Sequence, residues 1–151
     1  MTLATLSDVL QPALHGRYAV GGLVTLGWED MRAYAEAAQA LGAPLILQAG
    51  PSCREHTPLP VLGHMFRHLA ESVDVPVVAH LDHGYTYEEC KIALENGFTS
   101  LMYDGSRKPL SQNIWVGCGK SEKWMSCFHG IKLGKIEDNV DAAHQRVCNG
   151  L

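Results

Sequence analysis

An acid and two histidines stand together near the middle of the chain, in the sequence His80-Leu81-Asp82-His83-Gly84. They end an apolar run over residues 75–81, which is typical of a buried parallel strand. Alternation along a strand places His80 and Asp82 on one face, with His83 at the strand's exit. Charged and imidazole groups are unfavourable there unless they are paired, bind a metal or take part in chemistry. The pattern therefore favours His83 as a metal ligand and Asp82 as an acid or base.

Two other interpretations of the same residues stay open. In a structural one, Asp82 caps a helix that begins near Tyr85, and the histidines are satisfied by hydrogen bonds. In the other, Gly84 lets the phosphate of a nucleotide approach the start of that helix. A single glycine is weak support for a nucleotide site.

A second acid follows the next predicted strand. Residues 99–103 end at Asp104-Gly105-Ser106, which repeats the pattern of an apolar strand with an acid at its carboxyl end. Asp104 is either a turn residue or part of a site shared with Asp82 and His83. Taken alone, Asp104 is more typical of a turn residue. Two acids at the exits of successive strands make a shared site more plausible than either acid alone, because the carboxyl ends of parallel strands meet at one edge of a sheet.

The elements that must position these residues alternate between helix and strand. Helices are expected at 5–14, 28–41, 59–73 and 86–96, and strands at 18–24, 44–48, 75–81 and 99–103. A further helix should start near Pro109. This order predicts an α/β fold with a parallel sheet, either open and doubly wound or part of an eight-stranded barrel. A complete barrel needs about 250 residues, so the 151 residues here supply only part of one.

Two pairs of polar residues at helical spacing have ordinary structural interpretations. His64 and His68 lie four apart on helix 59–73, but no third ligand accompanies them, so we interpret them as exposed polar residues. Thr86 precedes Glu89 by three positions, which is typical of a capping box at a helix start.

Composition excludes several classes of partner. The formal charge of −4 and the pI near 6.0 give no electrostatic reason to expect nucleic acid or a membrane surface as a partner. Residues 1–16 lack the basic start and apolar core of a signal peptide. With five cysteines and no export signal, we expect reduced thiols and a cytoplasmic protein.

Several motifs resemble one known family, the class II, zinc-dependent ketose-bisphosphate aldolases. They are the sequences from His80 to Gly84, Gly97-Phe98-Thr99-Ser100 and Met102-Tyr103-Asp104-Gly105-Ser106. Tyr18-Ala19-Val20 and the segment 44–48 are similar to the family's first two strands. The resemblance runs from about Leu3 to Ile114.

The resemblance implies a TIM (β/α)8 barrel, of which this chain holds about the first four βα units. It implies reversible cleavage of fructose or tagatose 1,6-bisphosphate to glycerone phosphate and glyceraldehyde 3-phosphate, with Zn²⁺ as cofactor. By position, Asp82 resembles the family's proton donor and acceptor, and His83 the first of three zinc-binding histidines. Asp104 resembles an acid at an alternative metal position. A homo-oligomer is also implied.

The sequence departs from the family after Ile114. Three of the five cysteines and two of the three tryptophans fall in residues 115–151, without the metal-ligand spacings C-x-x-C or H-x-x-x-H. We therefore expect residues 1–114 to form the first half of an aldolase barrel, followed by a divergent, truncated or frame-disturbed tail. One histidine cannot hold zinc tightly, so the chain alone should have little or no activity. The alternative is a noncatalytic half-barrel that is a partner or regulatory subunit of an aldolase.

Overall fold

The chain alternates parallel strands with helices. The computed structural model describes residues 3–109 and 128–131. Its elements are β1 (Leu3–Ala4), α1 (Leu6–Gly16), β2 (Gly21–Thr25), α2 (Trp28–Leu41), β3 (Leu45–Ala49), α3 (Pro51–His56), α4 (Leu59–Glu71), β4 (Val77–Gly84), α5 (Tyr87–Glu95), β5 (Ser100–Tyr103) and β6 (Phe128–Ile131). The strands form one six-stranded sheet in the order β2-β3-β4-β5-β6, with β1 beside β4, and all pairs are parallel. The predicted α/β class is confirmed.

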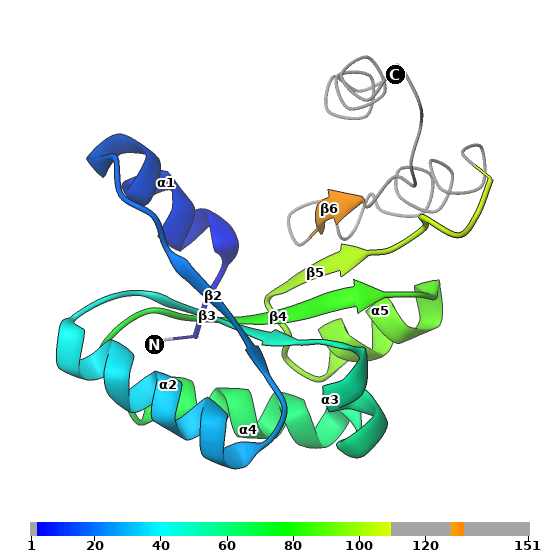
Figure 1. Ribbon diagram of the computed structural model, residues 1–151, viewed down its shortest axis with the longest axis horizontal. Helices are drawn as coiled ribbons and strands as arrows, with labels where there is room; N and C mark the ends of the chain where they lie inside the picture. Colours follow the sequence, from blue (N-terminus) through cyan, green and yellow to red (C-terminus); the bar gives the residue numbers. More distant parts are fainter. Residues whose placement is uncertain (1–2, 110–127, 132–151) are drawn as a thin grey trace.

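Helices cover the two faces of the sheet unequally (Figure 1). The helices α2, α4 and α5 lie on one side, and α1 lies on the other. Successive residues of a strand point to opposite faces, so the central strands contribute to both sides. Leu47 of β3 and Ala79 of β4 join the large core under α2, α4 and α5. Ile46 and Val78 instead pack against α1 in a smaller cluster.

The amphipathic helices were well predicted. The expected helix at 28–41 is α2, and it ends at Gly42, whose φ of 61° is a left-handed conformation that glycine adopts without steric penalty. In α4, Leu62, Phe66 and Leu69 are buried as their spacing predicts. His64 and His68 are exposed on the same helix, as interpreted from the sequence.

Other elements differ from the sequence-based expectation. The short elements β1 and α3 had not been predicted, and the first full strand starts at Gly21 rather than at Tyr18. The helix expected near Pro109 and the boundary between residues 114 and 115 lie outside the described residues. Beyond that gap, β6 adds to the sheet beside β5. Within residues 3–109 and 128–131, no helix is both long and apolar enough to cross a bilayer.

Candidate functional site

The end of β4 is bulged at the two residues that the sequence singled out. Leu81 pairs with Leu101 of β5, and Gly84 pairs with Tyr103. Asp82 and His83 therefore face the single residue between those partners, which is the two-against-one count of a β-bulge. His83 has a φ of 56°, an unusual conformation for a residue with a Cβ. A bulge re-aims side chains, so simple alternation does not hold beyond Leu81.

This bulge brings His83 against Asp104 at the end of β5. Nδ1 of His83 lies 2.6 Å from Oδ2 of Asp104, whose other oxygen accepts a 3.0 Å hydrogen bond from the amide of Ser106. Burial acts to raise the pKa of Asp104, but hydrogen bonds from Ser106 and His83 and the attraction of the imidazole outweigh it, and the pKa lies at about 2. Asp104 is therefore ionised at neutral pH and can only accept a hydrogen bond. Nδ1 of His83 must carry the proton.

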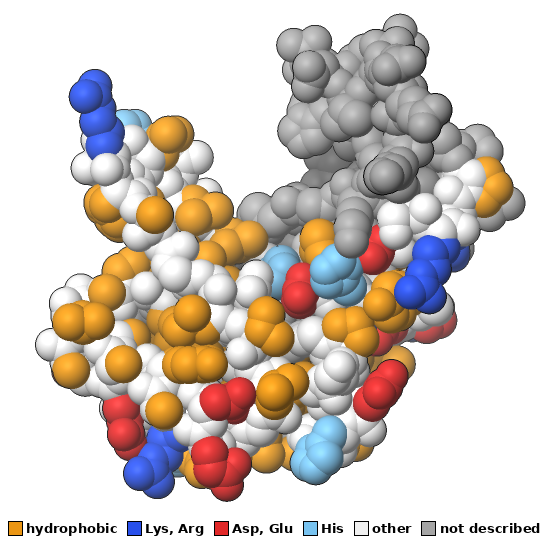
Figure 2. All heavy atoms as spheres, viewed as in Figure 1, with side chains coloured by type: hydrophobic (Ala, Val, Ile, Leu, Met, Phe, Trp, Pro, Cys, Tyr) orange, Lys and Arg blue, Asp and Glu red, His pale blue; other side chains and the backbone are white. Residues whose placement is uncertain are grey.

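The protonated Nδ1 leaves Nε2 of His83 as the nitrogen that can bind a metal or accept a proton. Nε2 lies 3.8 Å from Oδ1 of Asp82, whose side chain is 19% exposed. Figure 2 shows histidine and acidic side chains gathered over the carboxyl-terminal halves of β4 and β5. Asp82, His83 and Asp104, predicted from separate strand ends, thus lie together.

The third member of the sequence motif makes a separate contact. His80 is buried, and its Nδ1 lies 2.7 Å from Oγ of Ser100 on the neighbouring strand. This hydrogen bond joins β4 to β5 just before the bulge, where His80 and Ser100 are still paired in regular register. It therefore links the two strands whose ends carry Asp82, His83 and Asp104.

Sequence reasoning missed Arg54, a residue of α3 that contacts the backbone of the site. Its guanidinium donates to the carbonyls of Ala49 and Asp82, each at 2.6 Å, and to the carbonyl of His83 at 2.9 Å. Its Nε also bonds Glu89 at 2.8 Å. Arg54 lies on α3, a helix that the sequence did not predict, so no signal placed it near β4.

Of the structural interpretation, the hydrogen-bonded histidines are observed and the helix cap by Asp82 is wrong, and the nucleotide interpretation loses support. Thr86, whose hydroxyl accepts from the amide of Glu89, caps α5, and Asp82 does not. At Gly84, a Cβ would lie 2.8 Å from Sγ of Cys90 and 2.9 Å from a methyl group of Leu81. The side chains of Cys90 and Leu81 already pack against this glycine, so the absence of a side chain there is explained without a phosphate.

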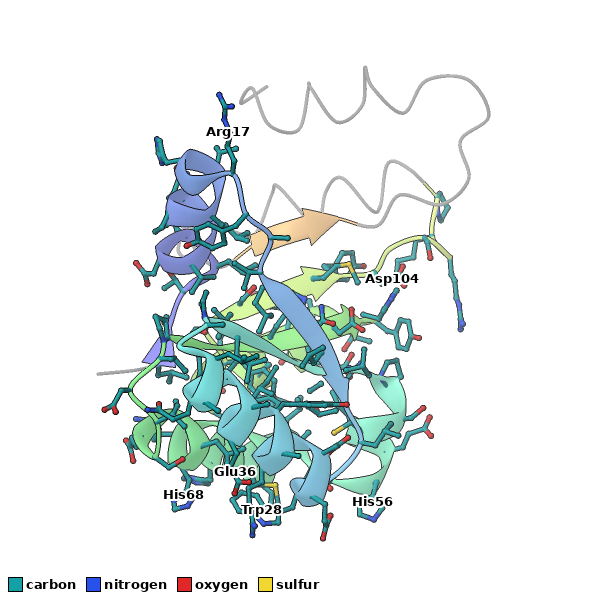
Figure 3. The ribbon with its side chains drawn as sticks, turned by 60° about the vertical axis from the view of Figure 1, so that its left-hand side comes forward. Arg17, Trp28, Glu36, His56, His68 and Asp104 are labelled. Carbon is teal, nitrogen blue, oxygen red and sulfur yellow. The ribbon has the colours of Figure 1, made fainter. Side chains whose placement is uncertain are left out.

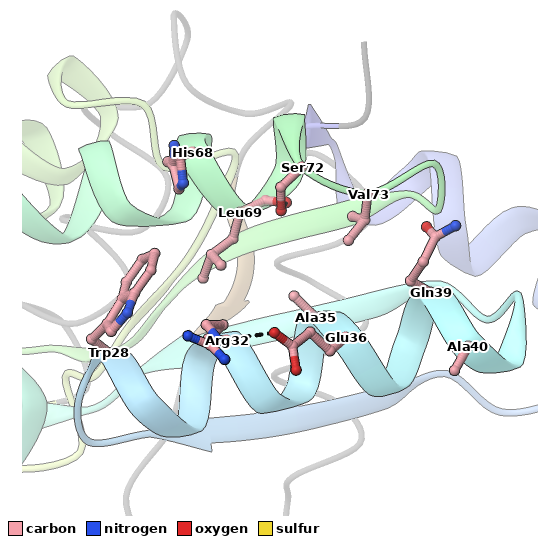
Figure 4. Close-up of a pocket in the computed structure, with 10 residues that line it drawn as sticks. All are labelled: Trp28, Arg32, Ala35, Glu36, Gln39, Ala40, His68, Leu69, Ser72 and Val73. Atoms are coloured by element: carbon pink, nitrogen blue, oxygen red, sulfur yellow. Dashed lines mark hydrogen bonds and ion pairs between the residues drawn. The ribbon is translucent and has the colours of Figure 1, made fainter.

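A groove on the outer helical layer is separate from this site. It has a volume of about 610 Å³ and lies between α2 and α4, lined by residues that include Trp28, Glu36 and His68 (Figure 4). The rings of Trp28 and His68 lie 5.8 Å apart. Figure 3 shows these labelled residues on the helical side of the molecule, away from Asp104 on the sheet.

The described residues do not form a metal site by themselves. Among residues 3–109 and 128–131, no group of three or more His, Cys, Asp or Glu side chains is arranged to hold a metal ion. A structural or catalytic zinc needs at least three protein ligands. His83 does fit one ligand position, because a metal-binding histidine commonly donates its other ring N–H to a carboxylate, as His83 does to Asp104.

Comparisons with known proteins agree on one family. The model of the family "Fructose-bisphosphate aldolase class-II" matches residues 4–131. A fructose-bisphosphate aldolase of Geobacillus stearothermophilus is 35% identical over 119 residues, which are 77% of this chain and 42% of the relative. A 6-phospho-5-dehydro-2-deoxy-D-gluconate aldolase of Bacillus licheniformis is 36% identical over 143 residues, 93% of this chain and 47% of the relative.

Solved structures give the same result for the fold. The YdjI aldolase of Escherichia coli K12 matches with a TM-score of 0.70 and 28% identity, over 76% of this chain and 45% of that chain. A putative fructose-1,6-biphosphate aldolase of Coccidioides immitis, at 21% identity, shares the fold with a TM-score of 0.68. The chain thus spans less than half the length of these relatives and holds part of their barrel. By its sequence and its fold, the chain belongs to the class-II fructose-bisphosphate aldolase family.

Proposed function

We propose that this chain carries the first half of the active site of a zinc-dependent aldolase that cleaves a phosphorylated ketose. One observation carries the proposal: Nδ1 of His83 lies 2.6 Å from Oδ2 of Asp104, which leaves Nε2 on the side of Asp82. A ligand nitrogen beside a carboxylate is what metal-assisted proton transfer requires. Membership of the family supports this choice over other metal-dependent reactions.

In the proposed reaction, Asp82 moves the proton. Cleavage of the carbon–carbon bond turns a hydroxyl of the ketose into an aldehyde, so a base must remove the hydroxyl proton as the bond breaks. In the reverse direction Asp82 returns the proton to the alkoxide oxygen. A zinc ion held at the site would supply Lewis-acid stabilisation for the negative charge that cleavage leaves on the other fragment. His83 is the proposed ligand among the described residues.

Asp104 has two proposed roles, orientation of His83 and direct binding of the metal, and the geometry favours orientation. Both of its oxygens already accept hydrogen bonds, one from His83 and one from the amide of Ser106. We therefore propose that Asp104 fixes the tautomer and orientation of His83. Binding of the metal by Asp104 at an alternative position, which the family resemblance implies, would require Oδ2 to leave His83.

The substrate class is a sugar phosphate. Fructose or tagatose 1,6-bisphosphate is the first candidate, because relatives from several bacteria are named fructose-bisphosphate aldolases. A second candidate is 6-phospho-5-dehydro-2-deoxy-D-gluconate, since the relatives of that name align over 93% of this chain. We also propose a homo-oligomer and a cytoplasmic location. Cys53 and Cys90 are free and buried, as in a reducing compartment.

We propose that the 151-residue chain alone has little or no activity. A zinc site needs several converging ligands, and the first half of a barrel supplies one histidine of the proposed set. Zinc content and cleavage of fructose 1,6-bisphosphate by the purified chain test this. Near-stoichiometric zinc with normal turnover would overturn it. In the alternative, the chain is a noncatalytic half-barrel partner or regulatory subunit of an aldolase, and it should then form a defined complex in size-exclusion measurements.

The role of His83 can be tested without turnover. Zn²⁺ is added to the chain, and the histidine ring resonances are followed by NMR. The resonances of His83 should shift or broaden first, and the His83→Asn variant should lose this response. His64→Asn is the matched control, because His64 is exposed on α4. Equal responses from all histidines would contradict the proposed ligand.

A further inference from the structure

We propose that Arg54 is a positioning residue of this site: its guanidinium holds the bulged end of β4 in the conformation that aims His83 at Asp104. The inference rests on the proposed function, because it concerns the same site. Arg54 reaches Asp82 and His83 only through their backbone carbonyls, so it acts through these residues and not on a substrate.

The contacts of Arg54 use the planar fork of the guanidinium. Nη1 donates to the carbonyls of Ala49 and Asp82, and Nη2 donates to the carbonyl of His83. The first carbonyl ends β3, and the other two belong to the bulge in β4. The Arg54 side chain is only 6% exposed, so water does not compete strongly for these carbonyls. One side chain thus ties together the carboxyl ends of two neighbouring strands.

The bulge needs such a partner. Asp82 and His83 lie where the pairing of β4 with β5 shifts register. A bulge leaves its extra residue outside the regular ladder, and a buried carbonyl without a hydrogen bond is unfavourable. The left-handed φ of 56° at His83 is unfavourable as well, because His83 has a Cβ. Such a conformation persists only where surrounding contacts impose it. The hydrogen bonds from Arg54 to both bulge carbonyls meet this condition.

Glu89 of α5 fixes Arg54 in turn. One carboxylate oxygen of Glu89 accepts from Nε of Arg54 at 2.8 Å, and the other accepts from the amide of Tyr85 at 2.8 Å. Tyr85 directly follows Gly84, the last residue of β4. The bulge is therefore held by Arg54 from α3 and, through Glu89, by the start of α5. Side chains outside the sheet, rather than the strand pairing, define where His83 points.

The test compares three arginine variants of the full chain. Arg54→Met removes all donors, and Arg54→Lys keeps the charge but cannot reproduce the planar fork. Arg32→Met is the control, because Arg32 forms a 2.8 Å pair with Glu36 on the exposed face of α2. The readout is the exchange with water of the hydrogen-bonded Nδ1–H proton of His83, assigned by its loss in His83→Asn.

We expect exchange at least about tenfold faster in Arg54→Met than in the unmodified chain, as for the loss of a hydrogen bond to a charged group. Arg54→Lys should be intermediate, and Arg32→Met unchanged. If Arg54→Met does not fold, Arg54→Lys decides. A purely structural role would lower the unfolding temperature and leave the His83 signal as it is, and that result in a folded Arg54 variant would overturn the inference.

The same samples separate this inference from the proposed function. Zn²⁺ titration of the unmodified chain asks whether His83 binds metal, whereas the exchange rate asks whether Arg54 positions it. Fast exchange in the Arg54 variants with no response of His83 to zinc would support positioning and reject the metal role. A zinc response with unchanged exchange would do the reverse.

Discussion

Two regions of this molecule contain the same kinds of side chain in opposite settings. Beside the carboxyl ends of β3 and β4, an ion pair joins Arg54 of α3 and Glu89 of α5, whose side chains are 6% and 24% exposed. On α2, Arg32 and Glu36 form a pair of equal length, but their side chains are 61% and 64% exposed. The outer pair contributes little to the stability of the fold because water screens its charges. In the inner pair, Arg54 is also hydrogen-bonded to the backbone carbonyls of the site.

The histidines differ in the same way. His83 is fixed by an ionised acid at 2.6 Å, while His68 on the outer groove is exposed and its ring lies 5.8 Å from that of Trp28, tilted by 41°. Residue type alone therefore does not identify a site. What distinguishes the inner region is that Nδ1 of His83 is hydrogen-bonded to Asp104 and the backbone of His83 to Arg54, so that the imidazole has a defined orientation.

Replacement of Arg54 should have the largest effect on the free energy of unfolding. Arg54→Met should lower the free energy of unfolding by roughly 3 kcal/mol, since it leaves the carbonyls of the bulge and the carboxylate of Glu89 without their partner. Urea unfolding at neutral pH measures it. A loss as small as that of Arg32→Met would mean that the two pairs are equivalent.

The acid of the site should give the next largest effect, and it should depend on pH. The pKa of Asp104 is about 2, below its ordinary value of 3.8, so its ionised form stabilises the folded state by about 1–2 kcal/mol after allowance for screening by solvent. This stability is complete above the unfolded pKa and is lost as the pH falls through the folded one. Asp104→Asn should therefore be less stable at pH 6, and the difference should shrink between about pH 4 and pH 2.

Unfolding of both proteins across that range of pH is the measurement. A difference that stays constant with pH would show that the carboxylate is not held by charge and hydrogen bonds. His83→Asn should remove part of the same pH dependence, because His83 is one of the groups that lower the pKa of Asp104.

Packing at the turn after the bulge should give a smaller effect. Gly84→Ala places a methyl group 2.8 Å from Sγ of Cys90 and should cost about 1–2 kcal/mol through overpacking. Combination with Cys90→Ala should recover part of the loss. Gly21→Ala on β2 is the control, since its added methyl meets nothing within 4 Å. Equal unfolding midpoints for the two glycine variants would contradict the packing at Gly84.

The outer pair should give the smallest effect. Arg32→Met should change the free energy of unfolding by less than about 0.5 kcal/mol, because both partners are mostly exposed and form an i,i+4 pair on one helix. Salt should reduce even this difference. A loss above that of Gly84→Ala would remove the contrast between the two regions.

Much of the fold could be predicted from the sequence, and the reasons are local. The apolar run before His80 and the helix-favouring segment from Trp28 to Leu41 carry their structure in their own residues. The bulge does not, because nothing in the residues from Leu81 to Gly84 specifies an extra residue or a left-handed histidine. Those features depend on Arg54, which is 28 and 29 positions away from the two carbonyls of the bulge.

The candidate site was predictable in part for the same reason. Asp82, His83 and Asp104 could be found because each ends an apolar strand, and parallel strands bring their ends together. Their mutual arrangement could not, since it requires the register shift between β4 and β5. The family resemblance supplied roles for the three residues, and these roles remain proposals for experiment.

The most direct test of the site is the location of a metal in crystals of this chain soaked with excess Zn²⁺. An anomalous difference map should place zinc about 2.0–2.1 Å from Nε2 of His83, with Nδ1 still bonded to Asp104. Zinc bound to Nδ1 with Asp104 displaced, or zinc elsewhere with His83 unoccupied, would contradict the account.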